Sequence, residues 1–344
     1  MNQTYERKDI DKSTIEFKIT IPSDNFEKSY KAILKDQLKD TEMKGFRKGK
    51  LPEDIIGQPV KQSIRFETFD KLAPFYIQTA LTKENVTPIA PPEYKDLPKL
   101  DMGKDIEFTI NITVMPEFKL GNLKKIKIKK ESLKIEDKEL EDTLSELKKS
   151  QKTEVKEIND DWTKEVTKIL GLKDINSLED FKNYIKNALL EQKEHMIMHR
   201  NQEDALKQAI VLSNIVIPEA AIKYEAQERE RSFNNEMKQR GVKVEDFIKA
   251  NNTTIEEMRK LWEQDSKEAI EADVFLSLYM KDRNIVVSDD DVKAKIDNIK
   301  KSAPENMDMS VYDNPDWVAY VKRVEEKEKT FEAFTKEIGL EHKD

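Results

Sequence analysis

The 344-residue sequence contains no cysteine, so the chain has no disulfide and no thiolate ligand for a metal ion, as is usual in a reducing compartment. It also has no N-terminal apolar segment of the kind that directs secretion, because residues 1–9 are mostly polar or charged. The strongest apolar run, residues 209–218, is interrupted by Ser213 and Asn214 and is far shorter than the about 20 residues of a membrane-spanning helix. We therefore expect a soluble, cytoplasmic protein.

The sequence has no overall excess of positive charge, and its net charge of -8 argues against a general nucleic-acid-binding protein. The charge is unevenly distributed, however. Residues 1–115 contain 19 basic and 19 acidic side chains, whereas residues 118–134 contain seven lysines and Glu131 as the only acid. The remainder is strongly acidic. This distribution indicates that different parts of the chain have different partners.

Hydrophobic residues make up only 37% of the chain and charged residues 38%, which is typical of elongated helical domains with much solvated surface. The length predicts two or three domains. The first domain is predicted to be α+β and the second half of the chain all-α.

Two strands are expected in the N-terminal part, because residues 13–21 and 106–115 alternate apolar and polar side chains. A first helix is expected from Asp24, with Glu27 as its capping partner, and a second helix over residues 60–81. The second helix is expected to pack five side chains toward the sheet: Ile64, Phe66, Phe69, Leu72 and Ile77.

Beyond Pro116 the alternating pattern nearly vanishes, and signals for helix N-termini follow one another. Three capping pairs predict such starts: Ser177 with Asp180, Thr254 with Glu257, and Ser288 with Asp291. Pro218 and Gly241 mark the start and the end of one predicted helix, and Asn314-Pro315 opens the last one. We therefore predict a helical body.

A short cationic loop follows the first predicted helix: Lys44-Gly45-Phe46-Arg47-Lys48-Gly49-Lys50-Leu51-Pro52. It contains four cations, no acid and one large aromatic, and its glycines allow positive φ. An exposed phenylalanine beside cations is suited to a surface that offers both negative charge and an apolar notch, such as a ribonucleoprotein. The alternative is a solvated basic turn without a partner.

The loop resembles the ribosome-binding signature of the trigger factor family, Gly-Phe-Arg-x-Gly-x-x-Pro, at Gly45, Phe46, Arg47, Gly49 and Pro52. The order strand, helix, signature loop, helix and strand is also similar. In that family the head domain docks beside the exit of the ribosomal tunnel. The resemblance assigns a contact with a ribosomal protein to Phe46, Arg47 and Lys48. It assigns the shape of the loop to Gly45, Gly49 and Pro52, and attraction to RNA phosphate to Lys44 and Lys50.

In this family a linker, an FKBP-like prolyl isomerase domain and a helical body with arms follow the head. Here Leu144–Gln151 resembles the end of the linker and Glu157–Trp162 resembles the start of the body. The few residues between them cannot form a domain, since the smallest self-sufficient domains need about 40 residues. We predict an α+β ribosome-binding domain, a linker of basic strip plus helix, and a helical substrate-binding body, over residues 1–115, 116–152 and 153–344, with the isomerase domain absent.

The resemblance implies an ATP-independent chaperone that shields nascent chains through weak apolar contacts and needs no cofactor. Methionine and aromatic side chains on an open surface suit this role, because methionine adapts its shape to different clients. The candidates for client contact are Met196, Met198, Phe233, Met237, Met307 and Met309. The alternative for each is burial between helices. The expected partners are the large ribosomal subunit, unfolded nascent polypeptides and, for the free chain, a second copy, but no membrane.

Other chemistries have weaker support. His195 and His199 are four residues apart on a predicted helix, but no third ligand is apparent. Residues 45–50 are similar to a phosphate loop, but they are one residue short and are followed by Leu51 instead of serine or threonine. We predict no metal site and no catalytic residue. The alternative functions are a prolyl isomerase, a helical scaffold and a periplasmic chaperone with a similar helical core.

Overall fold

The computed structural model describes residues 4–39, 55–129, 131–151, 155, 157–173, 175–303 and 309–340. The chain divides into two compact units. Unit 1 comprises Met1–Phe118 and Val216–Glu271, and unit 2 comprises Lys119–Ile215 and Ala272–Asp344. Each unit therefore combines segments that are far apart in the sequence.

The N-terminal part of unit 1, called the head here, contains a four-stranded antiparallel sheet in the order β1-β2-β4-β3. Its strands are β1 (Tyr5–Asp9), β2 (Thr14–Ile21), β3 (Glu93–Tyr94) and β4 (Ile106–Thr113). The central pair aligns Phe17 with Ile110 and Ile19 with Phe108, and these four side chains are buried. Both predicted strands are confirmed, because alternate side chains of each strand face one core.

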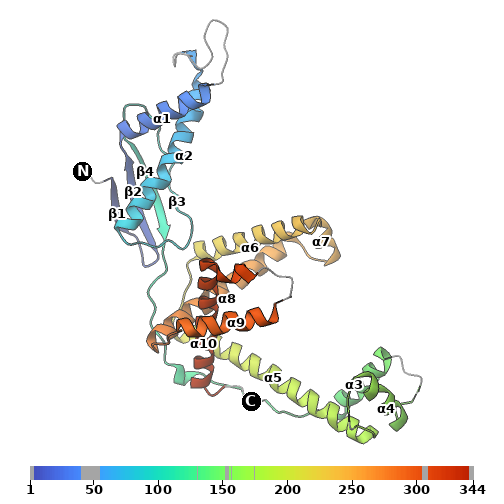
Figure 1. Cartoon of the computed structure of the whole chain (residues 1–344). Helices are drawn as coiled ribbons and strands as arrows, with labels where there is room; N and C mark the ends of the chain where they lie inside the picture. The colour runs from blue at the N-terminus through green and yellow to red at the C-terminus, as the bar shows by residue number, and fades with distance from the viewer. Residues whose placement is uncertain are drawn as a thin grey trace. The chain divides into compact units, whose positions relative to one another are not determined.

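Two helices, α1 (Ser23–Leu38) and α2 (Gln58–Lys83), cover one face of the sheet (Figure 1). Phe69 and Ile77 of α2 join the sheet residues in the main core of the head. The prediction for Phe66 was wrong, because this side chain is 41% exposed while Ile64 is fully buried. Residues two positions apart on a helix point to nearly opposite sides, so Ile64 and Phe66 cannot share the packed face.

The predicted cap of α1 was also wrong. The helix begins at Ser23, directly after Pro22, and no side chain caps it from within the helix. Instead, the backbone N–H of Ser23 donates to a carboxylate oxygen of Asp105 at 2.8 Å. The N-terminus of α1 is therefore satisfied from the segment that leads into β4, which a local pattern around Asp24 and Glu27 could not reveal.

The second part of unit 1 is helical and contains α6 (Glu219–Gln239), α7 (Val244–Ala250) and the first part of α8 (Ile255–Asp282). The ring of Phe233 lies 5.2 Å from the ring of Phe247 and 5.4 Å from that of Trp262, measured between centroids. These three aromatic side chains join the three helices. Gly241 follows α6 with φ at 68°, as predicted for a helix end, and Pro218 lies one position before the first helical residue.

The described residues of unit 2 form the remainder of α8 and seven further helical elements, of which α3 and α4 lie at one end of α5 (Figure 1). They are η2 (Leu123–Lys125), α3 (Asp137–Ser150), α4 (Asp160–Ile169), α5 (Leu178–Leu212), α9 (Asp289–Ser302), η3 (Met309–Asp313) and α10 (Pro315–Glu337). A hydrophobic cluster, called the tip cluster here, joins α3, α4 and the start of α5 through Leu144, Trp162, Val166, Phe181 and Ile185. A second core joins α8 to α10 through Phe275, Tyr279 and Phe334.

The three predicted capping pairs are confirmed. The side-chain oxygens of Ser177, Thr254 and Ser288 each accept a hydrogen bond from the backbone N–H three residues later, at 3.2 Å in every case. The last helix begins at Pro315, as predicted. Among the described residues after β4 there is no further strand, so the second half of the chain is helical as expected.

Candidate functional site

The residues predicted to bind the ribosome lie outside the described residues: Lys44, Gly45, Phe46, Arg47, Lys48, Gly49, Lys50 and Pro52. The structure does describe the elements on both sides of them. The end of α1 and the start of α2 pack together in a hydrophobic cluster that includes Ile33, Leu34 and Ile64, with Leu38 and Ile56 at its edge. The described residues on both sides of residues 40–54 are therefore anchored in the head, on two helices that support each other.

The methionines predicted to contact clients lie in different environments. Met196 on α5 is 54% exposed, and Met309 in η3 is 38% exposed. Met198 is half-buried, and Met307 lies outside the described residues. Of the described ones in unit 2, Met196 and Met309 thus present the most surface to solvent.

The two client candidates on α6 are placed differently. Phe233 is half-buried between Phe247 and Trp262, so much of its surface packs within the helical part of unit 1. Met237, one turn further along α6, is only 5% exposed. We assign Met237 to packing and keep the client role for exposed side chains, because a buried thioether cannot reach a client without a rearrangement of the helices.

Two turns expose valines that the sequence analysis did not single out. Each turn contains an asparagine with φ of 50°, two residues after the end of a helix. These residues are Asn214 after α5 and Asn284 after α8. The extended residues that follow alternate in burial, so that Val216 is 70% and Val286 is 79% exposed. The flanking side chains Ile215, Ile217 and Val287 are buried and hold the turns in place. The shared sequence Asn-Ile-Val is the signal that could have identified both sites.

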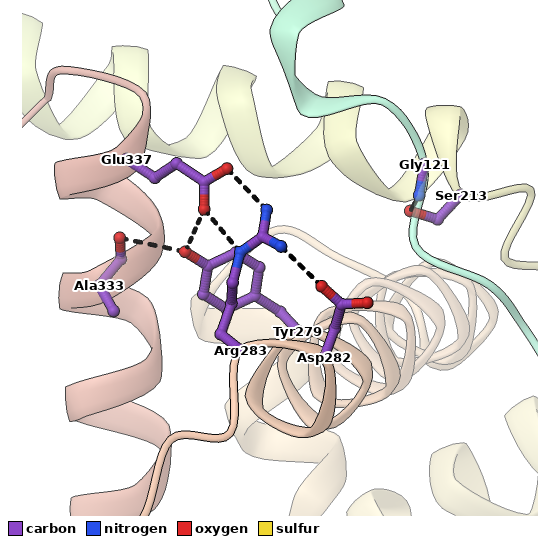
Figure 2. Close-up of polar contacts among 7 residues, drawn as sticks. All are labelled: Gly121, Ser213, Tyr279, Asp282, Arg283, Ala333 and Glu337. Carbon is purple, nitrogen blue, oxygen red and sulfur yellow. Dashed lines mark hydrogen bonds and ion pairs between the residues drawn. The ribbon is translucent and has the colours of Figure 1, made fainter.

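A polar cluster in unit 2 fixes α10 to α8 (Figure 2). The Arg283 guanidinium donates two hydrogen bonds to the Glu337 carboxylate, at 2.9 and 2.8 Å. The Tyr279 hydroxyl donates to the same carboxylate at 2.8 Å and lies 3.2 Å from the carbonyl oxygen of Ala333. Burial, with the bond to Glu337, raises the pKa of Tyr279 to about 12. The bonds from Arg283 lower the pKa of Glu337. Near neutral pH the Tyr279 hydroxyl therefore stays protonated and the Glu337 carboxylate stays ionised. The hydrogen bonds that hold α10 against α8 thus persist at this pH.

The resemblance described above predicts that the position of an isomerase domain, where one is present, corresponds to the segment between α3 and α5. Among its described residues the only regular element is α4, and Trp162 of this helix is fully buried in the tip cluster. No strand occurs in this described segment. It therefore provides no antiparallel sheet of the kind that an FKBP-like domain requires.

Two further classes of site were considered across the described ranges. No three His, Asp or Glu side chains there are grouped closely enough to hold a metal ion. None of the described helices is both long and apolar enough to cross a membrane.

Two family models match the chain. One, described as "Bacterial trigger factor protein (TF)", matches residues 1–147, and the other, described as "Bacterial trigger factor protein (TF) C-terminus", matches residues 177–336. The first match includes the head, the lysine-rich segment and most of α3. The second match includes most of the helices from α5 to α10. Between the two matches lie residues 148–176, which contain α4.

Known proteins support the same relationship. The trigger factor of Staphylococcus saprophyticus is 20% identical over 403 aligned positions, which cover 91% of this chain and 91% of the relative. The trigger factor of Clostridium botulinum (strain Hall) is 31% identical over 139 positions, which cover 40% of this chain and 32% of the relative. A solved chain described as "Promiscuous Substrate Recognition in Folding and Assembly Activities of the Trigger Factor Chaperone" shares the fold, with a TM-score of 0.59 at 14% identity over 97% of this chain and 100% of that one. The chain therefore belongs to the trigger factor family, whose members are ribosome-associated chaperones.

Proposed function

We propose that this chain docks on the large ribosomal subunit near the tunnel exit through residues 44–52, and that it acts there in the cytoplasm. The observation that carries the proposal is the signature from Gly45 to Pro52, which connects α1 to α2 in a head that the N-terminal family model covers. The two helices are held together at the ends nearest this segment. A cationic and aromatic loop on such a support is suited to a mixed surface of RNA and protein.

Cosedimentation of the full chain with purified ribosomes tests this docking. We expect the chain to pellet with ribosomes at low salt and to dissociate progressively as salt rises, because Lys44, Arg47, Lys48 and Lys50 contribute charge that counterions screen. A chain that stays in the supernatant at low salt would rule the docking out.

For the shielding of clients, we propose weak contacts with exposed apolar side chains of the helical body. Unit 2 exposes Met196, Val286, Met309 and Tyr320, and charged residues separate them along the sequence. Each contact alone is weak, but several contacts on one unfolded segment add up through high effective concentration. Release then follows when the client buries its own apolar residues, so no nucleotide is needed.

Polar substitution of two exposed side chains tests the client surface. We expect Met196→Gln together with Val286→Ser to weaken the suppression of aggregation of an unfolded client by about fivefold, because full burial of one such side chain contributes about 1.5 to 3 kcal/mol and client contact is partial. Stability should stay unchanged, since both side chains are exposed. A matched control is Gln192→Ser, which changes an exposed polar residue one turn before Met196. If the double variant suppresses aggregation as well as the Gln192→Ser control does, the client role of these positions is refuted.

We also propose that the chain has no prolyl isomerase activity, because α4 and its neighbours occupy the segment between the two family matches. In a protease-coupled assay on a proline-containing peptide, the chain is expected to leave the isomerisation rate at its uncatalysed value. A trigger factor that contains the FKBP-like domain serves as the positive control. Acceleration that scales with the concentration of this chain would show that the proposal is wrong.

A further inference from the structure

The lysine-rich segment identified in the sequence runs antiparallel to α5 within unit 2. Its residues from Gly121 to Lys134 meet α5 residues of steadily decreasing number. The contacts are Gly121 N–H to Ser213 Oγ at 3.0 Å, Lys127 N–H to Gln208 Oε1 at 2.9 Å, Arg200 Nη1 to Glu131 Oε1 at 3.2 Å, and Lys193 Nζ to the carbonyl oxygen of Lys134 at 2.8 Å. Figure 2 shows the first of them, at the end of α5. The segment is thus held along the helix.

The backbone of this segment is fixed at two points in particular. At Gly121 it approaches α5 so closely that an added Cβ would lie 2.4 Å from the carbonyl group of Leu212, which only glycine avoids. At Lys127 the Gln208 side chain accepts from the N–H and also donates to the carbonyl oxygen at 3.0 Å. Gln208 therefore pairs with Lys127 as a neighbouring strand would.

Side chains over residues 125–129 alternate in exposure. Ile126 and Ile128 are half-buried, whereas Lys125, Lys127 and Lys129 are exposed. Lys125 is the last residue of η2, and the chain becomes extended at Ile126. In an extended chain every second side chain faces the same way, so Lys127 and Lys129 lie about 6.6 Å apart on one side. No described carboxylate lies within 4.0 Å of these three ammonium groups. We call Lys125, Lys127 and Lys129 the lysine ribbon, a row of exposed positive charges without a close carboxylate among the described residues.

The chemistry of the lysine ribbon indicates a polyanion with closely spaced charges. Its spacing is of the same order as that of successive phosphates along one nucleic-acid strand, and a lysine ammonium binds phosphate as a point charge. A polypeptide would need an acidic residue at every second position to match the row, whereas every nucleotide carries a phosphate. Residues 119–134 contain no aromatic side chain on which a base could stack. Contact with the sugar–phosphate backbone is therefore favoured over base recognition.

We propose that the lysine ribbon is an RNA-binding surface that contacts the phosphate backbone, separate from residues 44–52. This RNA binding does not depend on the ribosome docking proposed above. The part of the chain after residue 134 is acidic and repels RNA, so within the helical body the lysine ribbon sets where an RNA strand lies.

Fluorescence anisotropy of a short labelled oligouridine with the full chain tests the proposal. Changing Lys125, Lys127 and Lys129 to glutamine is expected to weaken binding about tenfold at low salt and to reduce the slope of log affinity against log salt by about 2, as expected for three lost phosphate contacts. Arginine at the same three positions keeps the charge and is expected to keep the affinity. Because the arginine variant replaces the same three side chains, loss of oligouridine affinity in that variant too would point to structural damage and not to the lost charge.

A matched control changes Lys182, Lys186 and Lys293 to glutamine, which removes the same charge from exposed positions elsewhere in unit 2. This control is expected to leave oligouridine binding nearly unchanged. The proposal would be overturned if both glutamine triple variants weakened oligouridine binding equally. It would also be overturned if polyglutamate bound as tightly as oligouridine and the change of Lys125, Lys127 and Lys129 to glutamine abolished that binding. The ribosome docking proposal is tested separately, because it fails if a variant of residues 46–48 still cosediments with ribosomes. Failure of that proposal and failure of the RNA-binding proposal can therefore be told apart.

Discussion

Replacing Phe46, Arg47 and Lys48 together with alanine is expected to abolish cosedimentation of the chain with ribosomes while leaving its helical content unchanged. A buried aromatic and an arginine at the centre of an interface each contribute about 2 kcal/mol or more, so their joint loss weakens binding by about a thousandfold. The fold should survive, because α1, α2 and their shared cluster lie outside the substituted residues.

The control for this variant removes the same kinds of side chain from another exposed part of the head. Lys71, Phe75 and Lys83 of α2 are exposed, and Phe75 is 67% exposed. Their joint change to alanine removes one aromatic and two cations and is expected to leave cosedimentation intact. If the variant of residues 46–48 still pellets with ribosomes in moderate salt, or if the control loses binding equally, the docking role of the signature is refuted.

Substitution of Trp162 with alanine is expected to cost about 3 to 5 kcal/mol of unfolding free energy, the range observed for large aromatic side chains in cores. Trp162 is fully buried in the tip cluster, where its ring lies 5.9 Å from that of Phe181. The loss removes the main contact of α4 with α5, so we expect α3 and α4 to detach while the head stays folded in unit 1.

Urea unfolding followed by circular dichroism measures this effect, with ribosome cosedimentation as a test of the head. Trp162→Phe keeps most of the packing and should cost much less than alanine. Leu170→Ala, at the end of α4 where the side chain is 42% exposed, should change stability little. An unfolding curve for the alanine variant that matches that of the unsubstituted chain would show that the tip cluster contributes no stability.

Much of the fold could be predicted from the sequence because the deciding interactions are local. The alternation over residues 13–21 and 106–115 identified β2 and β4, since one face of each strand is buried. Ser177, Thr254 and Ser288 identified helix starts, since a capping side chain bonds to a backbone group only three residues away.

The cap of α1 and the burial of several side chains depend on contacts between residues distant in the sequence. The local sequence pattern could not predict these features. Asp105 caps α1 from a position far along the chain, so the local pair Asp24 and Glu27 misled the prediction. The burial of Met237 and the exposure of Val286 likewise depend on which helix lies opposite, not on residue type. The domain boundaries 1–115, 116–152 and 153–344, and the homodimer of the free chain, stay predictions.

Site-specific photo-crosslinking from position 46 is the most direct measurement of how the chain meets its partner. With a photoreactive phenylalanine analogue in place of Phe46, we expect crosslinks to one protein of the large ribosomal subunit when ribosomes are present. The same probe in place of Phe75, which is exposed on α2, should give no such product. Crosslinks from position 46 only to this chain itself, with or without ribosomes, would contradict the proposed role of the signature.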